Sequence, residues 1–131
     1  MQKLIFFSML ILFLGACNSK PQENIQLNNG EKWLVNAEMK PHVQLSSKIF
    51  SDYLAQSGSD YKKLATDLKD QNDQLIKSCT MKGESHDELH KWLHPHITLV
   101  SNLAEAEDAT TAKSIVAQLE QSFKTYHNYF Q

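Results

Sequence analysis

Four stretches of the chain repeat apolar residues at the spacing of an α-helix, and this repetition is the strongest constraint on the fold. Within each stretch the apolar side chains fall on one face when successive residues are turned by about 100°. Four amphipathic helices joined by short connections predict an all-α fold, an up-down-up-down four-helix bundle over residues 37–131. The expected helices run from about Pro41 to Gln56, Tyr61 to Thr80, Ser85 to Leu103 and Asp108 to Phe130.

The third expected helix contains a proline, Pro95. The apolar phase continues unbroken from Leu93 to Ile97, on either side of it. Proline removes one backbone hydrogen bond and bends a helix without necessarily ending it. We therefore predict one helix kinked at Pro95. At its start, Ser85 and Glu88 have the spacing of a capping box, in which each side chain accepts from a free backbone amide.

Composition limits the class of protein. The 131 residues leave room for one domain, and the four glycines and three prolines disfavour a turn-rich all-β chain. The chain has 13 lysines and arginines against 15 acidic residues, a formal charge of -2. A nucleic-acid binder would need a basic face, so we expect no nucleic-acid partner.

The N-terminus is typical of a targeting segment. Lys3 is followed by an apolar run, residues 4–14, which has the length of a signal-peptide core and is too short to span a bilayer. Leu14–Cys17 then resembles the lipobox of bacterial lipoproteins. The resemblance implies a signal peptide over residues 1–16 and a Cys17 that carries acyl chains such as palmitate. It also implies a membrane-anchored protein of the cell envelope, facing the periplasm or the cell exterior.

The next residues, 17–36, are expected to be a flexible tether. Residues 18–30 are polar and contain few large apolar side chains. Trp33–Val35 is a short apolar patch, which we expect to pack across one end of the bundle.

Metal-ligating side chains are expected to gather at one end of the bundle. In an up-down-up-down bundle, that end holds the start of the first helix, the end of the second, the start of the third and the end of the fourth. Imidazole suits Zn and Cu, while thiolate and thioether favour Cu(I). The sequence therefore predicts a Cu or Zn site. Its candidate ligands are His42, Cys79, Met81, His86, His90 and His127.

Three of the histidines, His86, His90 and His94, are spaced four residues apart. Adjacent pairs at this spacing share a helix face and can bind one ion. The nearby carboxylates Glu84, Asp87 and Glu88 are candidate acceptors that orient the imidazoles.

Other roles stay open for these residues. Cys79 lies on an apolar face, where a cysteine is often a small core residue. Met39 and Met81 fit packing at a bundle end, and His127 fits a solvent-exposed boundary.

The C-terminal part resembles the soluble periplasmic b-type cytochromes with a four-helix bundle. The likeness lies in Gln118–Leu119, Tyr126–His127 and Leu99–Val100, with Met39 where that family has its methionine ligand. It implies a non-covalent haem b held by Met39 and His127 and a role in electron transfer. Pro41 departs from the family pattern, because it places Met39 outside the first helix. The chain has no Cys-x-x-Cys-His, which excludes covalent haem of the c type.

The sequence thus predicts an envelope-anchored lipoprotein that binds a copper-like ion or haem b, for metal handling or electron transfer. The alternative is a non-catalytic interaction module that docks an envelope protein through an apolar patch near Trp33 and Trp92. An enzyme with a Cys79 nucleophile and a His86 base is conceivable. No orienting triad, glycine loop or acid pair accompanies these two residues, so we do not predict an enzyme.

Overall fold

The computed structural model describes residues 24–131, and in this part the chain folds into four α-helices, which confirms the predicted all-α four-helix bundle. Each helix begins and ends within two residues of its predicted bounds. Among the described residues, no helix is long and apolar enough to cross a bilayer. The predicted signal peptide and lipidation site lie outside the described residues. The helices are α1 (Lys40–Ala55), α2 (Tyr61–Ser78), α3 (Glu84–Glu105) and α4 (Ala109–Tyr129).

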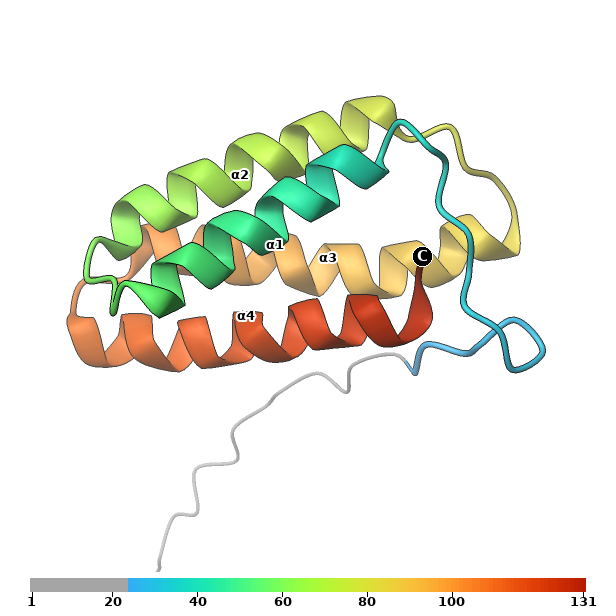
Figure 1. Cartoon of the computed structure of the whole chain (residues 1–131). Coiled ribbons are helices and arrows are strands. Elements are labelled where there is room, and N and C mark those ends of the chain that lie inside the picture. Colours follow the sequence, from blue (N-terminus) through green and yellow to red (C-terminus); the bar gives the residue numbers. More distant parts are fainter. Residues whose placement is uncertain (1–23) are drawn as a thin grey trace, which may run out of the picture.

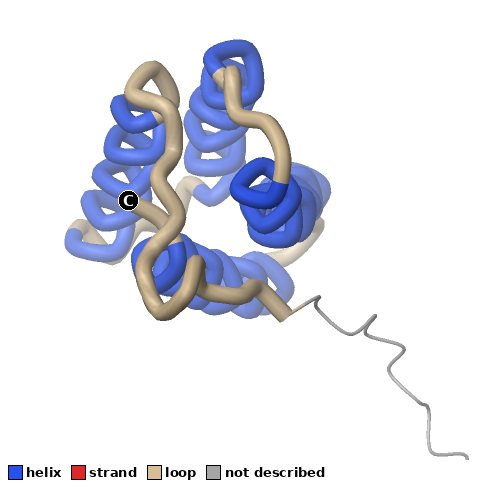
Figure 2. Tube along the Cα trace, turned by 90° about the vertical axis from the view of Figure 1, so that its right-hand side faces the viewer, coloured by secondary structure: helices blue, strands red, loops and turns tan. Residues whose placement is uncertain are grey.

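The helices lie alongside one another, each returning next to the one before it (Figure 1), around a shared interior that is seen end-on in Figure 2. At one end, the Tyr61 hydroxyl donates to the carbonyl oxygen of Ala106, which joins the start of α2 to the end of α3. At the other end, Asn36 donates to the carbonyl oxygen of Ser78 at 2.9 Å and accepts from the Thr80 amide. The segment that leads into α1 and the end of α2 therefore meet there.

The core is built in two parts along the bundle axis. At the end that holds the start of α1 and the end of α4, the buried cluster consists of Ile25, Trp33, Val35, Met39, Val43, Leu75, Leu89, Trp92, Leu93, Tyr126 and Phe130. The second cluster fills the opposite end, with Phe50 of α1 against Phe123 of α4 at a ring-centroid distance of 5.0 Å. Both clusters draw on all four helices, so each end of the core is built by the whole bundle.

The start of α3 differs from the predicted capping box. The residue before the helix is Gly83, whose φ of 68° lies in the left-handed region that favours glycine, and no side chain caps the helix there. Ser85 donates its hydroxyl to the Lys82 carbonyl, while Glu88 points to another part of the chain. The predicted capping box was therefore wrong, because the Glu88 carboxylate accepts hydrogen bonds from Gln26 and Lys91 and not from the backbone at the start of α3. Pro95 lies inside α3, which continues through it as one helix.

The first described residues, 24–36, form an N-terminal strap that packs on the bundle. The Trp33 amide donates to the carbonyl oxygen of Tyr129 at 2.8 Å, and the Gln131 amide donates to the carbonyl oxygen of Trp33 at 2.9 Å. Ile25, Trp33 and Val35 are buried in the core. The packed part of the chain therefore begins no later than Ile25, and not at the predicted boundary, residue 37. Three buried apolar side chains and the backbone hydrogen bonds of Trp33 hold the strap on the bundle.

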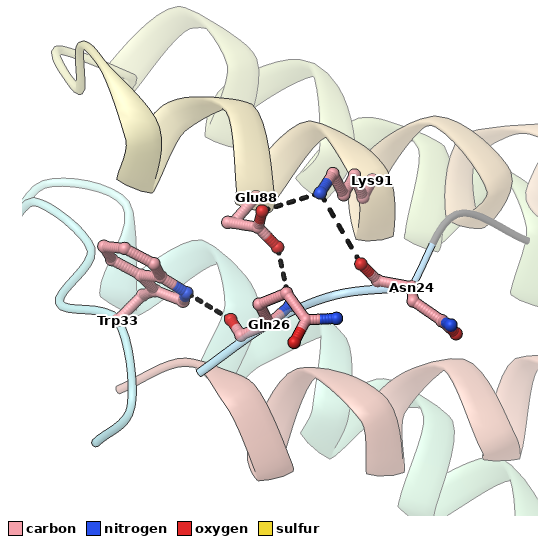
Figure 3. A network of polar contacts seen from close by, with 5 residues as sticks. All are labelled: Asn24, Gln26, Trp33, Glu88 and Lys91. Carbon is pink, nitrogen blue, oxygen red and sulfur yellow. Dashed lines mark hydrogen bonds and ion pairs between the residues drawn. The ribbon is translucent and has the colours of Figure 1, made fainter. Parts of the chain in front are cut away.

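Glu88 of α3 holds the strap in place (Figure 3). Its carboxylate accepts from the Gln26 amide at 2.8 Å and from the Lys91 ammonium at 2.6 Å. The Gln26 carbonyl in turn accepts from the Trp33 indole N–H at 2.6 Å. Burial alone would raise the pKa of the Glu88 carboxyl, but the hydrogen bonds from Lys91 and Gln26 outweigh it and hold that pKa below its usual value.

Replacing Glu88 with alanine is expected to loosen the strap and to lower the free energy of unfolding by about 1–3 kcal/mol, because the Gln26 amide loses its acceptor. Amide hydrogen exchange at Gln26 should become faster. The matched control is Glu84→Ala, which removes an exposed carboxylate from the same end of α3. Equal exchange rates at Gln26 in the two variants would show that Glu88 does not hold the strap.

Candidate functional site

The first half of α3 carries a row of three neighbouring imidazoles that are tilted relative to one another, here called the histidine ladder (His86, His90 and His94). The ring centroids of His86 and His90 lie 4.1 Å apart, and those of His90 and His94 lie 4.6 Å apart. His86 and His90 are half-buried, while His94 is exposed. The spacing of four residues therefore places each adjacent pair on one face, as predicted.

The pKa of His90, the middle ring of the ladder, lies below its usual value. Burial lowers the pKa of His90 first, and the neighbouring His86 and His94 lower it further, while Asp87 acts in the opposite direction. The neutral imidazole, with a free lone pair, is the form that binds a metal ion. A lowered pKa therefore favours the ligating form of His90 near neutral pH.

The carboxylates near the ladder do not all play the predicted orienting role. Glu88 binds the strap and Lys91, so it is not an acceptor for the imidazoles. On α3 it lies roughly 160° around the helix axis from His90, on another side of the helix. Asp87 does act electrostatically on His90.

The remaining predicted ligands do not join the ladder. His42 of α1 places its Nδ1 3.4 Å from Oε1 of Gln71, and His127 of α4 places its Nε2 3.5 Å from the Ser47 hydroxyl. Within residues 24–131, no three His, Cys, Asp or Glu side chains are grouped to hold one metal ion. The shared end of the bundle fixes the level of these residues along the axis but not the side of the helix on which each lies.

The sulfur side chains belong to the packing of the interior. Cys79 and Met81 are half-buried and contact the core cluster at this end of the bundle. Cys79 is the first residue after α2, and its amide donates to the Ile76 carbonyl. These contacts match the core role that the sequence left open for both residues.

The predicted haem ligands do not fit a common haem. Met39 is 0 % exposed and lies in the core cluster with Trp92 and Tyr126. His127 is exposed beside Ser47, on the outer surface of the bundle. One ligand thus lies in a packed interior and the other on the surface, and we derive no haem chemistry from them. Met39 immediately precedes α1, as Pro41 led us to expect.

A buried histidine lies on the inner face of α3. His96 is 1 % exposed, and its Nδ1 lies 2.8 Å from the Ser122 hydroxyl. Its ring stacks on Trp92 at a centroid distance of 4.8 Å and meets Phe123 edge-on. Burial lowers the pKa of His96 to about 4. His96 is therefore a neutral core histidine and not a metal ligand.

Comparisons of the chain with protein-family models, with curated proteins and with solved structures found no match.

Proposed function

We propose that this chain is an envelope-anchored lipoprotein whose helical bundle binds a transition metal ion, Cu or Zn. The observation that carries the proposal is the pair of imidazoles of His86 and His90, whose ring centroids are 4.1 Å apart. Two histidines on successive turns of one helix are a ligand pair that metalloproteins use. Both rings are partly accessible, so an ion can reach them without opening the core.

A pair of protein imidazoles leaves the other coordination positions to solvent or to donors from another molecule. Such an open site favours uptake and release over permanent storage, because a closed four-ligand shell is the mark of a structural ion. The pair therefore fits metal handling better than metal-stabilised folding.

The place where the strap joins the bundle supports the proposal that α3 lies close to the membrane. Its first described residue, Asn24, has its carbonyl oxygen 3.5 Å from the Lys91 ammonium on α3, next to His90 in the sequence. Asn24 is the seventh residue after the proposed lipid anchor at Cys17. A fully extended chain of that length spans at most about 25 Å. Lipidation at Cys17 would thus keep α3 and its histidine ladder near the bilayer surface.

The alternative is an interaction module that docks an envelope protein through an apolar patch. Trp33 is 7 % exposed and Trp92 is 2 % exposed, so the two indoles themselves are not the docking surface, while Leu34 beside Trp33 is 67 % exposed. Trp92 packs against Tyr126 and Phe130 of the C-terminal segment, at ring-centroid distances of 4.8 and 6.5 Å.

Titration of the full chain in detergent with Zn²⁺ and Cu²⁺ tests the proposal. The double variant His86→Ala/His90→Ala is expected to bind at least roughly tenfold more weakly, because the second ligand of a chelating pair multiplies affinity. Its far-UV circular dichroism should be unchanged, since both rings are only half-buried.

The matched control is His42→Ala/His127→Ala, which removes two imidazoles elsewhere and should leave binding intact. If the control weakens binding as much as the ladder variant does, the site has been assigned to the wrong residues. Haem offered to the same protein is expected to produce no Soret band of a histidine–methionine ligated haem.

A further inference from the structure

The histidine ladder has two nearly equivalent gaps. The centroid distance and ring tilt are 4.1 Å and 50° for His86 and His90, and 4.6 Å and 45° for His90 and His94. Imidazole nitrogens bind divalent transition metals at about 2.0–2.1 Å, so an ion bridging two rings joins nitrogens about 3–4 Å apart. In both pairs the ring centres of two neighbouring imidazoles, at the i, i+4 spacing of helical metal-ligating pairs, lie close enough for one nitrogen of each ring to reach a shared ion. The geometry that qualifies the first pair therefore qualifies the second pair as well.

The three rings cannot serve one ion together. His86 and His94 are eight residues apart on α3, a rise of about 12 Å along the helix axis. This is twice the rise of about 6 Å that separates each adjacent pair, and His90 lies between the two outer rings. The described residues accordingly contain no group of three such ligands around a common point.

The two pairs cannot each hold an ion at the same time either. A neutral imidazole carries its proton on one ring nitrogen and offers a lone pair only on the other. His90, the ring common to both pairs, therefore binds one ion at a time.

We propose that the ladder holds a single divalent transition metal ion in two alternative positions, an inner one between His86 and His90 and an outer one between His90 and His94. This inference rests on the proposed function and deepens it. His94 is exposed whereas His86 is half-buried, so the outer position meets solvent first. An ion captured there reaches the inner position by exchanging one ligand while His90 stays bound.

Isothermal titration of the full chain in detergent with Zn²⁺ separates the roles of the three rings. Because His90 serves both positions, His90→Ala is expected to weaken binding at least roughly tenfold. His86→Ala and His94→Ala each remove one of two similar positions and should weaken binding only about twofold, the statistical factor for losing half of the bound states. The double variant His86→Ala/His94→Ala should match His90→Ala, and the wild type should bind one ion per chain.

Two results would overturn the inference while leaving the proposed function standing. The first is a His94→Ala variant that binds as the wild type does, together with a His86→Ala variant as weak as His90→Ala, which would place the ion in the inner position alone. The second is a stoichiometry of two ions. If all three single variants and the double variant bind Zn²⁺ as the wild type does, the proposed function itself fails. Unchanged far-UV circular dichroism in each variant ensures that lost binding is not lost folding.

Discussion

The Trp92→Ala variant is expected to lose about 3–5 kcal/mol of unfolding free energy, as large aromatic deletions in a packed core do. The side chain is buried at the centre of the cluster at the strap end of the bundle. Its indole contacts the rings of His96 and Tyr126, each at a centroid distance of 4.8 Å, and Phe130 at 6.5 Å. Small domains are stable by only about 5–15 kcal/mol, so this one substitution removes a large share of the stability.

Urea unfolding followed by far-UV circular dichroism measures this loss. The control is Trp92→Phe, which keeps an aromatic ring but removes the indole N–H that donates to the Ser122 carbonyl at 2.8 Å. Trp92→Phe should lower the free energy of unfolding less than Trp92→Ala does, because the phenyl ring retains part of the aromatic contacts. A Trp92→Ala protein that loses under about 1 kcal/mol, in the range of surface substitutions, would contradict the central position of this residue.

The helices were predictable because the signal for them is local. An apolar stripe every 3.6 residues marks each helix, and the connections are short. The strap was not predictable in the same way, since it depends on contacts between distant residues. The Gln26 amide and the Glu88 carboxylate that accepts from it are 62 positions apart. Ile25 lies between Asn24 and Gln26, and no periodic apolar pattern indicates that it is buried.

The same distinction explains which part of the candidate site was predictable. The ladder depends only on the spacing of four residues within one helix, and the structure confirms it. To group His42 and His127 with the ladder, one would have to know how α1, α3 and α4 are each turned about their own axes. The packing of the core sets that rotation, and it turns His42 toward Gln71 of α2 and His127 toward Ser47 of α1. Sharing an end of a bundle was therefore insufficient to place ligands around one ion.

His96 should make the bundle sensitive to mild acid. In the folded protein burial lowers its pKa to about 4, from an ordinary value of 6.5. The unfolded chain therefore binds a proton at His96 as the pH falls below 6.5, whereas the folded chain does not until the pH nears 4. This contribution to stability is fully present above pH 6.5 and is lost progressively below it. The linkage relation predicts a loss of about 2 kcal/mol between pH 7.5 and pH 5.

Urea unfolding at a series of pH values tests this dependence. The comparison protein is His96→Leu/Ser122→Ala, which removes the imidazole together with the hydroxyl 2.8 Å from its Nδ1, so that no buried polar group is left without a partner. Other groups whose pKa is lowered in the folded state, such as Glu88 and Asp108, are present in both proteins and cancel in the difference. The double variant should be less sensitive to acid by about 2 kcal/mol over that range. Parallel pH profiles for the two proteins would mean that His96 is already protonated, or accessible to water, in the folded bundle.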